Sequence, residues 1–186
     1  MRIIRVEAYN PLWKEEFEKA KAAYAQLLKD MDVEIIHVGS TSVEGLWAKP
    51  ILDIDIVVKT TDESQQVIER LAGVGYEHLG DLGIKGREAF NHPTENTFIK
   101  WMDHHLYVCI EGSENLVNHL LLQRHLRNNK EAVDDYSQIK RELAKAHPND
   151  IDAYVDGKTA LITSFLEKEG MASDALGRIE DINTLK

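Results

Sequence analysis

The sequence predicts an α+β fold with a mixed β-sheet, flanking helices and a C-terminal helical segment. Short β-branched stretches and helical periodicities alternate as far as residue 112, and only helical patterns follow. The chain has 186 residues, 43% of them hydrophobic and 29% charged, as in a single globular unit. We therefore expect an α/β core over residues 1–112, a helical segment packed on it over 113–170, and a weakly patterned tail over 171–186.

The first predicted elements are a helix and two strands. Apolar residues recur at helical spacing from Trp13 to Leu28, behind Pro11, which suits the first turn of a helix. Residues 33–38 and 51–58 are short and rich in β-branched side chains, which is typical of strands. The loop between these two strands is rich in small residues.

The later elements are predicted from residues that typically begin or end helices and strands. Asp62 is expected to cap a helix that stops near Gly73, and Ser113 a helix that runs to Leu126. Further strands are expected over 76–79, 87–90, 97–102 and 105–110, with a tight turn at Asp103 and His104. Two more helices are expected over 131–146 and 150–167, and the tail from Met171 is expected to fray.

The composition excludes several classes of protein. The net charge of -10 at pH 7 argues against a surface built for general nucleic-acid binding. No apolar run is long enough for a transmembrane helix, and residues 1–9 lack the apolar stretch of a secretory signal. Cys109 is the single cysteine, so neither an intramolecular disulfide nor a cysteine zinc cluster is expected. A cytoplasmic protein without a membrane partner is the simplest expectation, and the oligomeric state stays open.

Two carboxylates share one face of the strand predicted over residues 51–58. Asp53 and Asp55 are two positions apart, so their side chains point the same way, while Leu52 and Ile54 point the other way. Like charges aimed together repel unless a cation lies between them, and Mg²⁺ commonly takes one or two carboxylates plus substrate phosphates. The pattern predicts a magnesium site at Asp53 and Asp55, against the plainer interpretation of two solvated carboxylates.

The loop before this strand has the residue types of a phosphate site. Gly39 allows close backbone approach, and the amides and hydroxyls of Ser40, Thr41 and Ser42 can surround an anion. Lys49 can supply a positive charge, although a surface lysine fits its position equally well. A P-loop is excluded, because this loop leads into a strand rather than a helix. The plainer alternative is that the hydroxyls bond their own backbone.

Loop and strand together resemble the signature of the nucleotidyltransferase superfamily, the DNA-polymerase-β-like proteins: Gly-Ser at a strand end, a spacer, then Asp-x-Asp on the next strand. The chain more closely resembles the GrpB family, from residue 5 to residue 168. The likeness lies in residues 9–13, 37–43, 45–46, 48–51, 53–54, 83–87 and 104–106, and in Leu126, Arg127, Tyr136, Lys140, Tyr154 and Lys158 of the helical half.

This resemblance implies a nucleotidyltransferase-like fold and a set of roles. Asp53 and Asp55 would hold Mg²⁺ against the phosphates of a nucleoside triphosphate seated over Gly39 and Ser40, with Arg87 as a further phosphate contact. Some relatives are fused to dephospho-CoA kinase, which implies a link with nucleotide or coenzyme A metabolism. The ligand expected is therefore a nucleotide or another phosphorylated small molecule.

The later half is expected to bind the second substrate. Tyr107, Gln123 and Arg127 are its candidate contacts. The chain departs from the GrpB pattern at Tyr107, where many relatives carry a histidine, and at Gln123 and Arg124, where many carry Arg-Asp. Substrate choice is expected to vary at these positions.

A third carboxylate, which catalytic nucleotidyltransferases usually hold on a later strand, is not evident in the sequence. Either His105 or Tyr107 takes that role, or the protein does not catalyse transfer. Two main hypotheses follow. The first is a Mg²⁺-dependent enzyme that transfers a nucleotidyl group to an unknown small acceptor, and the second is a non-catalytic nucleotide- or coenzyme-binding module acting with a partner enzyme. A purely structural interaction protein is the third.

Other polar residues receive plainer interpretations. His37 at a strand end is more often structural than catalytic. Basic residues of the helical half alternate with acidic ones and are interpreted as a solvated helical face. They are Arg124, Arg127, Lys130, Lys140, Arg141 and Lys145.

Overall fold

The computed structural model describes residues 3–93 and 102–184. The helices are α1 (Leu12–Leu27), α2 (Thr61–Gly73), α3 (Glu114–Asn128), α4 (Lys130–Ala146), α5 (Ile151–Lys168) and α6 (Ser173–Thr184), and a 3-10 turn spans Ser40–Ser42. The strands are β1 (Glu34–Val38), β2 (Leu52–Val58), β3 (Glu77–Gly80), β4 (Arg87–Asn91) and β5 (His104–Ile110). Helices and a mixed sheet make an α+β fold, as predicted.

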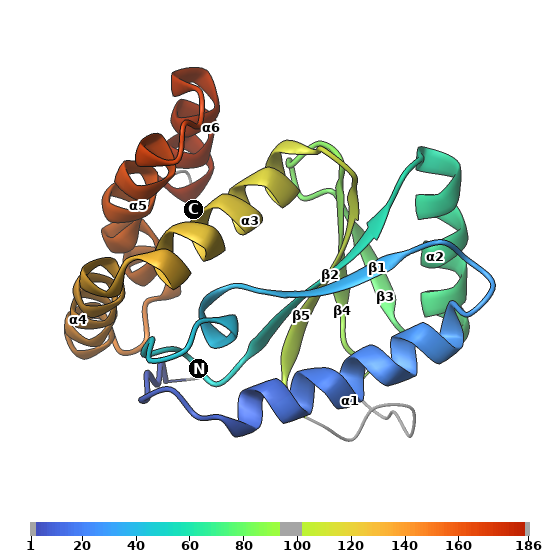
Figure 1. Ribbon diagram of the computed structural model, residues 1–186, viewed down its shortest axis with the longest axis horizontal. Helices are drawn as coiled ribbons and strands as arrows, with labels where there is room; N and C mark the ends of the chain where they lie inside the picture. The colour runs from blue at the N-terminus through green and yellow to red at the C-terminus, as the bar shows by residue number, and fades with distance from the viewer. Residues whose placement is uncertain (1–2, 94–101, 185–186) are drawn as a thin grey trace.

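The strands form one sheet in the order β1-β2-β5-β4-β3. β2 and β5 run parallel, and every other pair is antiparallel. Helices α1 and α2 lie on one side of the sheet, and α3 crosses the other side toward the group formed by α4, α5 and α6 (Figure 1). The strand that carries Asp53 and Asp55, β2, therefore lies inside the sheet, between β1 and β5.

The alternation along β2 determines which face becomes the core. Leu52, Ile54 and Ile56 are fully buried in a cluster with apolar residues of α1 and α2, such as Trp13 and Leu71. Burying apolar surface of this kind contributes roughly 25 cal/mol per Å². The opposite face is left to the odd-numbered residues of β2.

The helical half packs on the loop that follows β1. Val43 and Leu46 of this loop share a buried cluster with Leu126, Val133 and Phe165 of helices α3, α4 and α5. The Trp47 backbone N–H also donates to the Ser137 hydroxyl, at 3.1 Å. The loop is thereby fixed against the helices.

Two local expectations are corrected. Helix α2 is capped by Thr60 rather than Asp62: its hydroxyl accepts from the Glu63 N–H, and the Glu63 carboxylate accepts in return from the Thr60 N–H. This reciprocal capping box satisfies two donors that a cap at Asp62 would leave open. The predicted turn at Asp103 and His104 is also wrong, because His104 begins β5, which pairs with Leu52 on β2.

The tail does not fray as expected. Residues after Met171 form α6, whose Ala175, Leu176 and Ile179 pack with Leu166 of α5. Apolar residues spaced by three and four explain this helix. The strand predicted over 97–102 falls almost wholly outside the described residues. Among the residues that are described, no helix is long and apolar enough to cross a membrane.

Candidate functional site

The candidate site lies on the sheet face opposite the core. Asp53 and Asp55 project from β2 on this side, as their alternation predicts. Parallel pairing with β5 places His105 beside Asp53 and Tyr107 beside Asp55. Four side chains that can bind ligands or move protons therefore meet on two adjacent strands.

Asp53 and His105 are hydrogen-bonded at the open part of the site. The distance from His105 Nδ1 to Asp53 Oδ1 is 2.9 Å, and the side chains are 47% and 28% exposed respectively. Burial works to raise the pKa of Asp53, but the hydrogen bond from His105 and the positive charge nearby outweigh it and lower the pKa. Asp53 is therefore held as an anion.

Asp55 is enclosed, so the interpretation of two solvated carboxylates is wrong for this residue. Its side chain is 0% exposed, and its Oδ2 lies 2.8 Å from Nδ1 of His119 on α3. Burial alone would lower the pKa of His119, but the charge and hydrogen bond of Asp55 raise it overall. Within the described chain, Asp55 Oδ1 has no hydrogen-bond partner. A buried carboxylate oxygen without a partner is the kind of atom that a cation can satisfy.

Gly39 brings the backbone of the loop against Asp53. Its φ is 68°, in the left-handed region that favours glycine. A Cβ at this position would lie 2.7 Å from the Asp53 carboxyl carbon and closer still to Oδ2, so any side chain would collide with the carboxylate. Glycine at position 39 is thus required by the close approach to Asp53 as well as by the backbone conformation.

Lys140 joins the site from the helical half. It is 2% exposed, so its assignment to a solvated helical face is wrong. Its Nζ donates to the Ser40 hydroxyl at 3.1 Å and lies 4.2 Å from the Tyr136 ring centroid. Burial lowers the pKa of Lys140 well below its ordinary value. An enclosed lysine with a single hydroxyl partner would gain from a nearby anion.

Two further lysines lie near Asp53. Lys158 on α5 and Lys49 both lie over the Tyr154 ring, at 5.2 Å and 5.7 Å from its centroid. Burial lowers the pKa of Lys158, and the charge of Asp53 opposes that shift. Lys49 in turn helps to lower the pKa of Asp53. The cationic charge near Asp53 therefore comes from both halves of the chain.

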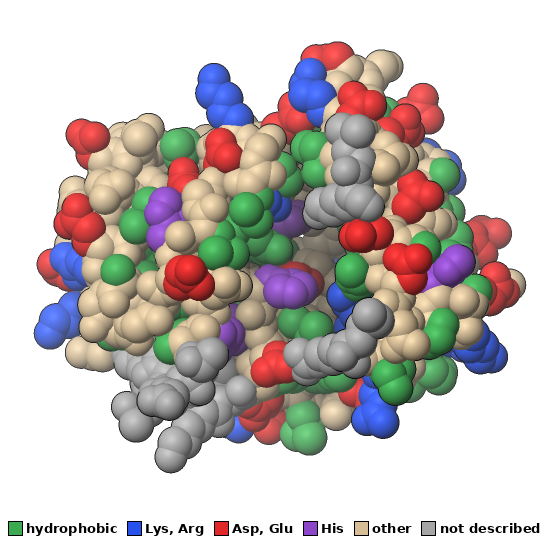
Figure 2. Space-filling view, turned by 180° about the vertical axis from the view of Figure 1, so that it is seen from behind, with side chains coloured by type: hydrophobic (Ala, Val, Ile, Leu, Met, Phe, Trp, Pro, Cys, Tyr) green, Lys and Arg blue, Asp and Glu red, His purple; other side chains and the backbone are tan. Residues whose placement is uncertain are grey.

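A cavity of about 210 Å³ adjoins this cluster and is lined by Asp53 but not by Asp55 or Lys140. Gly39, Ser40, Asp53 and Tyr107 line it from the sheet side, and Lys158 lines it from α5. A space-filling view shows a hollow in the middle of one face, with histidine side chains beside acidic ones (Figure 2). The cavity has the mixed charge that a phosphorylated ligand with a cation would need.

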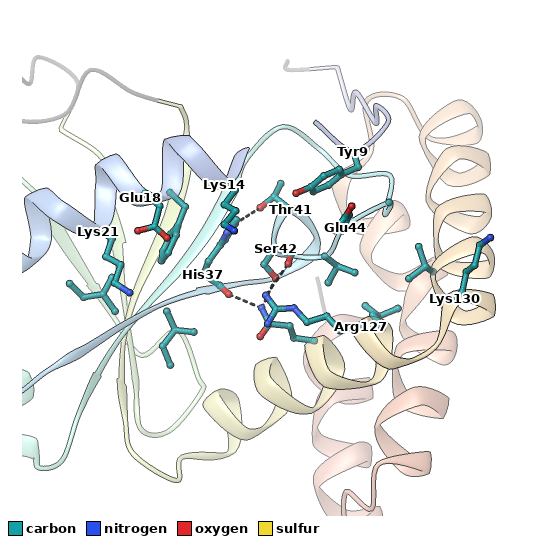
Figure 3. Close-up of a pocket in the computed structure, with 18 of the residues that line it drawn as sticks. Tyr9, Lys14, Glu18, Lys21, His37, Thr41, Ser42, Glu44, Arg127 and Lys130 are labelled. Atoms are coloured by element: carbon teal, nitrogen blue, oxygen red, sulfur yellow. Dashed lines mark hydrogen bonds between the residues drawn. The ribbon is translucent and has the colours of Figure 1, made fainter. Parts of the chain in front are cut away.

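The structure separates Thr41 and Ser42 from this cavity. They line a second cavity, of about 770 Å³, together with His37 and Arg127 (Figure 3). Thr41 Oγ1 lies 2.9 Å from His37 Nε2, and the Ser42 hydroxyl donates to the Gly39 carbonyl at 2.7 Å. These hydroxyls hold the loop in shape, which agrees with the plainer interpretation of their role.

Gln123 and Arg127 fasten the loop from α3. The Gln123 amide donates to the His37 carbonyl at 2.7 Å and to the Ser42 hydroxyl at 2.6 Å, and the Arg127 guanidinium donates to the Ser42 carbonyl at 3.0 Å. Gln123 lines both cavities, whereas Arg127 lines only the larger one. Of the three predicted substrate contacts, Tyr107 and Gln123 line the smaller cavity and Arg127 does not. Burial lowers the pKa of His37 to about 4, so this ring is neutral near pH 7.

Arg87 and Tyr107 lie together at the edge of the site. The Arg87 guanidinium carbon is 4.9 Å from the Tyr107 ring centroid, and a guanidinium N–H donates to the Asp81 carbonyl at 3.3 Å. Burial raises the pKa of Tyr107, and the charge of Asp53 adds to the rise. Tyr107 is therefore a proton donor near pH 7 and cannot replace a third carboxylate as a base.

Asp53 and Asp55 can hold a magnesium ion only if a bound ligand supplies further coordinating atoms. In residues 3–93 and 102–184, no group of three or more His, Cys, Asp or Glu side chains could hold a metal ion. Mg²⁺ needs fewer protein ligands than that, because water and substrate phosphates supply the rest. Asp53 and Asp55, with the unpartnered Oδ1 of Asp55, fit a metal bound together with phosphate.

The sequence did not indicate that three residues belong to the site: His119, Lys140 and Lys158. Lys140 had a signal: Val133, Tyr136 and Lys140 recur at helical spacing and share the buried face of α4. A lysine on an apolar stripe indicates a buried charge with a partner. His119 has no such signal, because only the packing of α3 on the sheet brings it to Asp55.

Comparison with known proteins identifies the fold and the family of the chain. A crystal structure of the Cid1 poly(U) polymerase aligns over 75% of this chain and 42% of its own, with a TM-score of 0.51 and 17% identity. At that identity the likeness concerns the fold alone, which is that of the nucleotidyltransferases. The chain belongs to the GrpB family. The model of this family, whose description is GrpB protein, matches residues 3–168 of the chain.

Relatives of known sequence or structure support the family assignment. The crystal structure of GrpB from Enterococcus faecalis has a TM-score of 0.76 and 30% identity, and the alignment covers 94% of this chain and 98% of that one. The protein YqkA of Bacillus subtilis is 31% identical over 157 residues, which are 84% of this chain. The alignment spans only 44% of YqkA, so the chain matches less than half of that relative.

Proposed function

We propose that the protein is a Mg²⁺-dependent enzyme that transfers a nucleotidyl group from a nucleoside triphosphate to a small acceptor. The observation that carries the proposal is the meeting of Asp53, the unpartnered oxygen of Asp55 and the Gly39 backbone beside the buried Lys140 and the half-buried Lys158. This combination holds cations and anions at one place, which is what binding a metal–triphosphate complex requires.

The phosphates would contact the loop and the helical half. Ser40 already accepts from Lys140, and both groups can turn to a phosphate oxygen. Lys158 reaches the cavity from α5. Charge-assisted hydrogen bonds of this kind are about twice as strong as neutral ones. Asp53 and Asp55 would hold Mg²⁺, which supplies charge neutralisation at the phosphates when bound.

His105 is the proposed general base. Asp53 holds the ring through Nδ1, which leaves Nε2 to take the proton of an acceptor hydroxyl. The acceptor oxygen then forms a bond to the α-phosphorus of the triphosphate, the bond to the β-phosphate bridge breaks, and pyrophosphate leaves. An exposed fraction of 47% allows His105 to meet a substrate from solvent. Without a third carboxylate on β5, this histidine is the base best placed to activate the acceptor.

The alternative is a nucleotide- or coenzyme-binding module that acts with a partner enzyme. It is favoured by the side chains opposite the two carboxylates on β5, which are His105 and Tyr107 rather than an acid. Binding would then use the same phosphate contacts, and no transfer would follow.

Calorimetry with ATP and MgCl₂ tests the proposal. The wild-type protein is expected to bind ATP only with the metal, and the double substitution Asp53→Asn with Asp55→Asn should abolish this metal dependence. Asp62→Asn, at an exposed position on α2, is the matched control and should bind as the wild type does. Circular dichroism checks that the fold persists. Equal ATP affinity in both proteins, with or without metal, would contradict the proposal.

Mass spectrometry of metabolite mixtures incubated with ATP separates enzyme from module. Transfer yields pyrophosphate and an acceptor carrying the nucleotidyl group, and His105→Ala should reduce the rate without removing ATP binding. Metal-dependent binding with no product in any mixture would favour the module.

A further inference from the structure

Helix α6 forms a wall of the candidate site. Ile179 and Asn183 line the same 210 Å³ cavity as Ser40, Asp53 and Lys158. In the ribbon view α6 stands beside α5, at the end of the helical half (Figure 1). The GrpB family match ends at residue 168, before this helix begins. The wall therefore lies outside the part of the chain that the family model matches.

Polar and apolar contacts hold α6 in this position. The Arg178 guanidinium makes a two-pronged contact with the Glu114 carboxylate at the start of α3, with distances of 3.0 Å and 2.6 Å. The Thr163 hydroxyl on α5 donates to the Glu180 carboxylate at 3.2 Å. On the inner side, Ile179 packs in the cluster of Leu166. The ion pair is exposed and contributes little stability, so the helix is held mainly by its apolar side.

The enclosed volume is small for a nucleotide. Pockets for drug-sized ligands usually measure about 300–1,000 Å³, and this one measures about 210 Å³. Asp53 lines it from the sheet and Lys158 from α5, whereas Ile179 and Asn183 line it from α6. A phosphate chain fits among the charged groups, and a sugar and base would need the room that α6 fills.

We propose that α6 sets how much of a phosphorylated ligand the site encloses, with Ile179 and Asn183 as the residues that limit its size. With α6 in place the site encloses the phosphate chain of a nucleoside triphosphate, and the nucleoside part is held less tightly because it meets the helix. This inference rests on the proposed function, since it takes the same residues as phosphate contacts.

Two probes of different size test the inference: inorganic tripolyphosphate and ATP, each with MgCl₂ in calorimetry on the full chain. The double substitution Ile179→Ala with Asn183→Ala should raise ATP affinity about tenfold and leave tripolyphosphate affinity within about twofold. Ile179→Trp should do the reverse and weaken ATP binding while it spares tripolyphosphate. Asp181→Asn, exposed on the same helix, is the control and should change neither affinity.

The outcomes separate the two proposals. Tripolyphosphate binding with the same ATP affinity in all four proteins overturns the role of α6 and leaves the phosphate site standing. Failure of every protein to bind either probe overturns the proposed function and this inference with it.

Discussion

His104 and His105 are neighbours on β5, yet they lie on opposite faces of the sheet. On the core face, His104 Nε2 lies 2.6 Å from the Tyr24 hydroxyl and 3.2 Å from the Tyr76 hydroxyl. Burial lowers the pKa of His104 to about 3, so the ring is neutral near pH 7. On the site face, His105 and His119 face carboxylates, and the pKa of His119 is raised.

The difference shows that partners, and not residue type, decide what a histidine does here. Tyrosine hydroxyls satisfy His104 without any charge, which suits a core. Carboxylates keep charge on the site face even where it is enclosed, as at Asp55. Charge in an enclosed place costs free energy, so the site face keeps its charged groups at a cost in stability that the core face does not bear.

The largest expected effect comes from removing the enclosed charge. Asp55→Ala leaves His119 without its partner, and breaking a buried pair from one side typically costs 3–5 kcal/mol. Because the His119 side chain is 23% exposed, we expect the lower end, about 3 kcal/mol. Urea unfolding measures this loss. A change below about 1 kcal/mol would show that the pair behaves like a surface pair.

A change of pH should affect the two faces in opposite directions. The unfolded pKa of a histidine is 6.5 and that of folded His104 is about 3, so the unfolded chain binds the proton first and stability falls as the pH drops below 6.5. Between pH 7 and pH 5 this costs about 2 kcal/mol, which His104→Gln should remove.

His119 should show the reverse slope, because its folded pKa is raised: its stabilisation is present below pH 6.5 and disappears as the pH rises through the folded pKa. Urea titrations at several pH values, with His104→Gln and His119→Gln beside the wild type, measure both slopes. Parallel curves for the three proteins would refute the contrast.

The smallest expected effect concerns the exposed pair. Asp53→Ala removes the partner of His105, but both side chains reach solvent, and exposed pairs contribute about 0.2–1 kcal/mol. The fold should therefore lose at most about 1 kcal/mol while Mg²⁺-dependent ATP binding disappears. If unfolding shows a loss as large as that for Asp55→Ala, the two carboxylates do not differ in the way their exposure indicates.

Local pattern was enough to predict much of this site face. The two-residue spacing of Asp53 and Asp55 and the position of Gly39 at a strand end are properties of short segments. These features follow from backbone periodicity, which a sequence displays directly.

What the sequence did not predict depends on packing between distant segments. His119 and Lys158 reach the site because helices α3 and α5 fold back on the sheet. Thr41 and Ser42 looked like phosphate contacts, yet the 3-10 turn points them to the other side of the loop. The direction of a side chain in an irregular loop has no fixed period, so residue type alone cannot give it.

The parallel pairing of β2 with β5 also has a consequence for how the chain reaches its native state. Asp53 and His105 are separated by 52 positions, so the site closes only after a long intervening segment has been ordered. Non-local pairings of this kind form late and slowly. Until β5 pairs with β2, one edge of β2 has unpaired backbone groups. This edge and its apolar residues can then pair with another chain and cause aggregation. Expression of this protein should accordingly be more sensitive to substitutions in β5 than to equally buried ones in α1.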